Sequence, residues 1–209
     1  MLERARMLSG RTIGEVARRL WQPLPDSQRR AKGFTGQLVE RALGASAGSK
    51  GEPDFVEIGV ELKTLPIGEN GNPKESTFVA SLPLMSLTEL DYEESYVASK
   101  LERVLFMPVQ AFGEFAHRLI GAPILWSPSD EERRVFQEDY DRIAGLVLDG
   151  RHDEITGHLG TYLQVRPKAA SAGVQGKVMD EHGRMAWTGP RGFYLRPSFT
   201  ATVLAGHHR

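Results

Sequence analysis

The sequence predicts an α/β protein in which helices flank a mixed sheet. Residues 54–63 alternate apolar and charged side chains, and this period of two is typical of a strand. Residues 103–109 are almost continuously apolar, which indicates a strand buried on both faces. From Ser129 to Gly150, apolar side chains recur at helical spacing behind three acids that suit the positive end of a helix. Two such strands and a long amphipathic helix favour the α/β class.

The remaining elements follow from caps, spacing and turn residues. Thr12 and Glu15 have the spacing of a capping box, and a helix is expected from there to Leu20. Shorter elements are expected as helices over 36–44 and 96–102, strands over 77–82 and 162–168, and a mobile glycine-rich connection over 173–189.

The length of 209 residues suits one domain with two lobes. The absence of cysteine excludes disulfides, thiolate metal sites and cysteine nucleophiles. No apolar run approaches the ~20 residues of a membrane span, and the first residues lack the apolar region of a signal peptide. A cytoplasmic protein with no membrane partner is therefore expected.

The net charge of −1 hides an uneven distribution along the chain. Residues 1–32 and 161–209 are basic, whereas residues 33–160 hold most of the acidic side chains. Basic ends around an acidic centre suit a protein that grips a polyanion and cuts it at a metal ion. The alternative is that these charges are scattered over solvated faces.

Residues 54–63 hold three acids and a lysine, of which Asp54, Glu61 and Lys63 are the candidate site residues. A tight turn at Ile58 and Gly59 would make a two-residue hairpin in which Asp54 lies opposite Lys63. Carboxylate oxygens suit Mg²⁺, and a nearby lysine can orient the water that attacks a phosphate. This Asp…Glu-x-Lys spacing is the PD-(D/E)xK pattern of restriction-endonuclease-like nucleases. The alternative is an amphipathic strand whose charges are solvated.

Two other patterns leave their interpretation open or argue against a site. Residues 190–196 interleave arginines with aromatic side chains, which suits base reading in DNA. The same residues also suit an edge hairpin whose Phe193 and Leu195 face the core. His152 and His158 do not have the spacing of a helical metal-ligand pair, so both are expected at the surface.

Several stretches together resemble the MutH mismatch-repair endonuclease family, in the same order along the chain. They are Leu43 to Lys50, Asp54-Phe55, Gly59 to Thr64, Lys100-Leu101, Arg103 to Leu105, Leu125 to Pro128, Tyr162 to Gln164, Arg166 to Ala170 and Arg191 to Leu195. The resemblance runs from about Leu8 to the end of the chain.

This resemblance implies a restriction-endonuclease-like fold with two lobes around a DNA-binding cleft. It implies one domain over residues 1–209, with a catalytic centre at about 36–110 and a DNA-reading part at about 160–200. The implied catalytic residues are Asp54, Glu61, Lys63, Glu40 and Lys100. The implied metal ligands are Asp54, Glu61 and the backbone carbonyl of Leu62. The implied DNA contacts are Arg166, Pro167, Lys168, Lys32, Phe78 and Tyr194, of which Tyr194 senses adenine methylation.

The activity that the resemblance implies is nicking of double-stranded DNA. The family cuts the unmethylated strand 5′ to the guanine of hemimethylated GATC, with Mg²⁺ as cofactor (Mn²⁺ substituting) and a 5′-phosphate product. Its partner MutL activates it after mismatch recognition by MutS, and a monomer is expected. Two alternatives stay open from the residues alone: a GATC-specific restriction endonuclease, and a non-catalytic DNA-binding protein.

Overall fold

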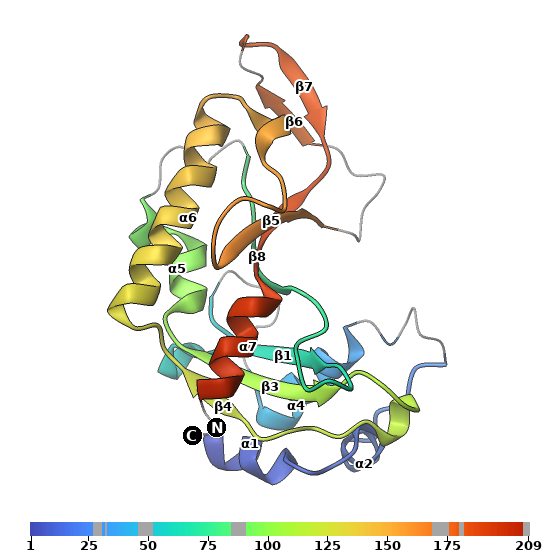
Figure 1. The fold of residues 1–209 in the computed structure, drawn as a ribbon. Helices are drawn as coiled ribbons and strands as arrows, with labels where there is room; N and C mark the ends of the chain where they lie inside the picture. Colours follow the sequence, from blue (N-terminus) through green and yellow to red (C-terminus); the bar gives the residue numbers. More distant parts are fainter. Residues whose placement is uncertain are drawn as a thin grey trace. The chain divides into compact units, whose positions relative to one another are not determined.

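The computed structural model describes residues 1–26, 31, 33–45, 52–84, 91–168, 176–179 and 182–206. The chain divides into two compact units. The first unit comprises Met1–Glu75, Glu102–Ser127 and Thr200–Arg209, and the second comprises Ser76–Leu101 and Pro128–Phe199. Each unit has a three-stranded sheet of its own (Figure 1).

The first unit has a mixed sheet in the order β1-β3-β4. Strand β1 (Glu61–Ile67) runs parallel to β3 (Val104–Gln110), and β4 (Ile124–Trp126) is antiparallel to β3. The first four residues of β3 are buried, as expected of a strand covered on both faces. The class predicted from the sequence, α/β with a mixed sheet flanked by helices, is confirmed for this unit.

Three helices of the first unit pack beside this sheet: α1 (Leu2–Leu8), α2 (Ile13–Arg19) and α4 (Phe34–Leu43). Helix α4 packs on β1, and α1 and α2 pack on α4. The predicted capping box is present, because Thr12 accepts from the backbone of Glu15 while Glu15 accepts from the backbone of Thr12. Helix α4 ends at Gly44, whose φ of 78° few other residues adopt. The helix that packs on β1 therefore ends at this cap.

The second unit has an antiparallel sheet in the order β2-β8-β5, formed by β2 (Thr77–Ser81), β8 (Arg191–Leu195) and β5 (Leu163–Pro167). Helix α6 (Asp130–Leu148) packs against β5, and α5 (Tyr96–Leu101) packs against β2. The predicted apolar stripe of α6 is buried, and Tyr140 stacks on Phe193 with ring centroids 5.4 Å apart. This contact fixes which face of the sheet is covered.

Short elements complete the described chain. They are the 3₁₀ turns Val56–Ile58, Tyr92–Glu94, Phe115–His117 and His152–Glu154, strands β6 (Gly176–Met179) and β7 (Met185–Thr188), and helix α7 (Pro197–Gly206). None of the described helices is both long and apolar enough to cross a membrane.

The structure differs from the interpretation of the sequence at three places among these elements. The glycine-rich connection expected over 173–189 contains the paired strands β6 and β7. The alternative of an edge hairpin over 190–196 is wrong, because β8 is central in its sheet, although Phe193 and Leu195 do face the core. His152 is buried, because Arg191 binds its carbonyl and holds this segment against the unit. His158 is exposed, as expected.

Candidate nuclease site

The turn before β1 differs from the predicted two-residue hairpin. Phe55 pairs with Val60, and the four residues between them form a 3₁₀ turn closed by Gly59 with φ of 61°. Val56 and Ile58 are 46% and 49% exposed, so the expected buried strand face does not extend through the turn. Continuing the Phe55–Val60 register places Asp54 opposite Glu61, and the predicted pairing of Asp54 with Lys63 is wrong.

The pairing nevertheless gathers the three side chains at the start of β1. One carboxylate oxygen of Asp54 accepts a hydrogen bond from the backbone N–H of Leu62 at 2.9 Å. Lys63 Nζ donates to Glu61 Oε1 at 2.6 Å. Glu61 is only 3% exposed, so the expectation of a wet, charged strand face is also wrong here. The buried Glu61 carboxylate is therefore paired with an ammonium group, as a buried charge requires.

Leu62 lies between Glu61 and Lys63 in β1. Its N–H points toward Asp54, whereas the N–H of Glu61 points toward the neighbouring strand and donates to Arg103. The N–H and C=O of one strand residue point to the same side. The Leu62 carbonyl therefore faces the same edge as Asp54, which is the position that a metal ligand would need.

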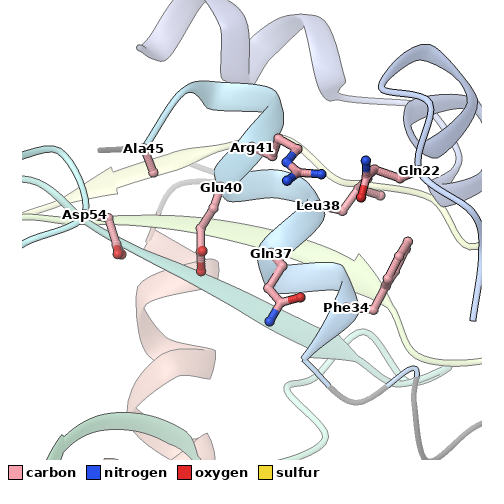
Figure 2. A pocket seen from close by; sticks show the side chains of 8 residues that line it. All are labelled: Gln22, Phe34, Gln37, Leu38, Glu40, Arg41, Ala45 and Asp54. Carbon is pink, nitrogen blue, oxygen red and sulfur yellow. The ribbon is translucent and has the colours of Figure 1, made fainter. Parts of the chain in front are cut away.

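Glu40 reaches this group from helix α4. Figure 2 shows its carboxyl group and that of Asp54 directed to the same side of a pocket of about 360 Å³. Partial burial raises the pKa of Glu40, nearby Asp54 and Glu61 add to the rise, and Lys63 opposes it. Arg41 points instead toward Gln22 (Figure 2). Glu40 thus belongs to the same electrostatic cluster as the other two carboxylates.

The oxygen atoms at this site suit a hard divalent cation as ligands. The carboxylates of Asp54 and Glu61 and the Leu62 carbonyl are all oxygen ligands, which Mg²⁺ prefers while keeping several waters. Across the described ranges, no group of three or more His, Cys, Asp or Glu side chains could hold a metal ion. The residues therefore fit a water-rich site with two carboxylates rather than a closed cage of protein ligands.

Most of the predicted DNA contacts of the second unit share one face of its sheet. Phe78, Tyr194 and Gln164 are paired in register across β2, β8 and β5, and paired residues share a face. Arg166 and Lys168 follow Gln164 at a spacing of two and so lie on that face as well. Phe78 and Tyr194 form an edge-on ring contact with centroids 5.3 Å apart. We call these five residues the reading face.

Three more predicted residues lie elsewhere. Pro167 is exposed at the end of β5, paired with Arg191, and has the opposite parity to the reading face. Lys100 lies in the last turn of α5, in the second unit. Lys32 falls outside the described residues.

Sequence reasoning missed three residues that support the reading face. Ser76 accepts hydrogen bonds from Gln164 and Arg166, and Ser81 accepts one from Lys168. Gly192 lies opposite Arg166 in the adjacent strand. No local motif marks these positions, because only the pairing of distant strands brings them together.

Comparisons with known proteins show to which family the chain is similar. A family model described as DNA mismatch repair enzyme MutH matches residues 43–139. The chain is 44% identical over 209 residues to the DNA mismatch repair protein MutH of Yersinia enterocolitica, covering 99% of this chain and 92% of the relative. It is 46% identical over 209 residues to that of Pectobacterium atrosepticum, covering 99% and 90%. It is 45% identical over 211 residues to that of Klebsiella pneumoniae, covering 99% and 90%.

The chain belongs to the MutH family. The resemblance expected from the sequence is thereby confirmed. The MutH family model covers Asp54, Glu61 and Lys63 but ends before β5 and β8. The alignments with MutH relatives cover nearly the whole chain and so include the reading face. Both groups of residues therefore lie within the likeness to MutH proteins.

Proposed function

We propose that this chain is the strand-nicking endonuclease of methyl-directed mismatch repair. It hydrolyses the unmethylated strand 5′ to the guanine of hemimethylated GATC, with Mg²⁺ as cofactor, and MutL activates it. The observation that carries this proposal is the meeting of Asp54, Glu61 and Lys63 at the start of β1 in a chain of the MutH family. The restriction-endonuclease-like fold is part of the same proposal.

The chemistry follows from the groups around β1. A bound Mg²⁺ supplies Lewis acidity that activates water and neutralises charge at phosphorus. Asp54, Glu61 and the Leu62 carbonyl would hold the ion, and Glu40 would add negative charge beside them. The Lys63 ammonium group orients the attacking water and stabilises the charge that develops in the transition state. Water adds to phosphorus and gives up a proton to solvent as the bond to the 3′ oxygen breaks, and the 3′ oxygen takes up a proton from solvent, which leaves a 5′-phosphate and a 3′-hydroxyl.

The reading face recognises the GATC sequence in the DNA. Arg166 offers the planar fork that pairs with guanine in the major groove, and Lys168 offers a second cation. Pro167 lies between them at the end of β5. Tyr194 senses the methyl group on adenine, and Phe78 supports it through their ring contact. Lys32 adds a DNA contact, Lys100 assists at the active site, and the protein works as a monomer in the cytoplasm.

Strand-resolved digestion tests this proposal. Duplexes with one GATC, each strand carrying its own label, are unmethylated, hemimethylated or fully methylated, and are incubated with and without Mg²⁺ and MutL. We expect a single nick in the unmethylated strand 5′ to guanine, dependent on Mg²⁺ and faster with MutL. Simultaneous cuts in both strands would identify a restriction endonuclease instead. Binding without any cut would identify a non-catalytic DNA-binding protein.

A further inference from the structure

Hydrogen bonds within the second unit hold the cationic side chains of the reading face. Ser76 precedes β2, and its Oγ accepts from Arg166 Nη1 at 3.0 Å and from Gln164 Nε2 at 2.7 Å. Ser81 ends β2, and its Oγ accepts from Lys168 Nζ at 3.0 Å. Each predicted base-reading cation is therefore tied to a serine on the far strand of the sheet.

Strand β8 lies between these partners, and its sequence allows the side chains to cross it. Gly192 is paired with Arg166 on one side and with Ser81 on the other. A Cβ on Gly192 would lie 2.8 Å from Phe78 Cε2 and 3.0 Å from the Ala80 carbonyl oxygen, so no side chain fits there. The position of Gly192 on this face is thus clear of any side chain of its own, whereas Tyr194 occupies the next position of β8 on the same face.

An irregularity in β2 brings the second serine to the correct face. The register between β2 and β8 shifts between Phe78 and Ala80, as in a β-bulge. Phe78 and Ser81 consequently both face the same side as Tyr194 and Gly192, although they are three residues apart. Lys168 Nζ lies 5.1 Å from the centre of the Phe78 ring, which adds a cation–π contact to its hydrogen bond with Ser81.

We infer that Ser76 and Ser81 are positioning residues that set the sequence discrimination of the nuclease. This inference rests on the proposed function. Arginine and lysine side chains lose much rotamer freedom on binding, and a side chain ordered in advance avoids that loss. A guanidinium group held in one plane can pair bidentately with guanine, whereas a freely rotating one can also pair with phosphates of any sequence. Ser76 therefore directs Arg166 toward bases, and Ser81 does the same for Lys168.

The test compares nicking of GATC with nicking of sites in which one base is changed. The measured quantity is the ratio of kcat/KM values for the two substrates. Ser76→Ala is expected to reduce this ratio by about three- to tenfold, the loss that follows from ordering one flexible side chain at each encounter. Ser76→Thr keeps the hydroxyl group and is expected to restore most of the ratio. Ser81→Ala should show the same change through Lys168.

A double-mutant cycle separates positioning from a general structural role. In an Arg166→Ala background, Ser76→Ala is expected to change the ratio no further, because the side chain that it positions is gone. Ser9→Ala, at an exposed serine in the first unit, serves as the matched control. An unchanged ratio for Ser76→Ala, or an equal effect with and without Arg166, would overturn the inference alone. A wild-type protein that never nicks GATC would overturn the proposed function and this inference with it.

Discussion

At the scale of single residues, the charge balance at the start of β1 determines what the site attracts. Three carboxylates, Glu40, Asp54 and Glu61, influence one another there, and Lys63 is the cation that interacts with Glu40 and Glu61. Burial makes the excess of negative charge more costly than it would be in water. A divalent cation would relieve that cost, and this is the physical reason for proposing a metal ion at the cluster.

The pKa of Glu40 gives a first prediction about this cluster. Burial, and then Asp54, raise that pKa in the folded protein, so the folded chain keeps the proton to a higher pH than the unfolded chain does. Stability should therefore fall as the pH rises from the unfolded-state pKa to the folded-state pKa, and should stay reduced above it. Glu40→Gln removes this penalty, so its stability relative to wild type should increase with pH over that window.

Urea unfolding in EDTA, from about pH 4 to about pH 8, measures this difference. Glu57→Gln removes the same charge at an exposed position in the turn and is the matched control. If the difference in stability between Glu40→Gln and the wild-type protein stayed constant with pH, the raised pKa of Glu40 could not be its cause. With Mg²⁺ present, the wild-type protein should gain more stability than the Glu40→Gln variant, because the ion favours the charged form of the cluster.

At the scale of elements, strand β5 is oriented by a loop that two charged side chains hold. Asp139 of α6 is buried and accepts hydrogen bonds from the backbone N–H groups of Thr161, Tyr162 and Leu163, at 2.7 to 2.8 Å. Arg196, just after β8, donates to three carbonyl groups of the same loop, those of Gly157, Leu159 and Gly160. The register of β5, and with it the position of Arg166, depends on this loop.

Asp139→Asn should therefore destabilise the protein by about 3 kcal/mol, because an amide keeps only one of the two accepting oxygens and turns an N–H donor toward the backbone N–H that the other oxygen held. The midpoint of urea unfolding measures the effect. Asp141→Asn, an exposed position on the same helix, provides the comparison and should change the midpoint little. Equal midpoints for the two variants would show that the Asp139 hydrogen bonds contribute nothing net.

The turn before β1 shows where sequence reasoning succeeds and where it stops. Alternation and glycine at position 59 correctly predicted that the chain reverses there and that Asp54 returns to Glu61 and Lys63. The length of the turn was wrong, because pairing of Phe55 with Val60 and the 3₁₀ geometry between them decide it. Periodicity reports which side chains alternate, whereas register depends on partners that the local pattern does not contain.

At the scale of the whole molecule, long helices and buried strands were predictable and strand order was not. The caps of α2 and α6 and the apolar β3 carry their signals within a few residues. Strand β8 enters between β2 and β5 from late in the chain, and this insertion brings Ser76 to Arg166. A contact between residues 90 positions apart leaves no periodic trace in the sequence.

The division into two units predicts that cutting by the charged residues at the start of β1 is separable from reading, although the proposed active-site residue Lys100 belongs to the second unit. Glu61 belongs to the first unit, and Arg166 and Tyr194 belong to the second. Glu61→Gln keeps the shape of the side chain and an acceptor for Lys63, but it removes the charge that a metal ion needs. Its nicking rate should fall by at least about a hundredfold, as when a charge-stabilising group is lost. Its affinity for hemimethylated GATC duplexes, measured by fluorescence anisotropy, should stay near that of wild type.

Arg166→Ala should behave in the opposite way, because it removes a base contact and leaves the chemistry of the first unit in place. Its nicking rate at saturating DNA should change less than its preference for GATC over altered sites. For both variants, binding should weaken steeply as salt increases, since phosphate contacts release counterions. If Glu61→Gln lost DNA affinity as strongly as it lost nicking, or if Arg166→Ala kept its full preference for GATC, the assignment of cutting and reading to separate units would be wrong.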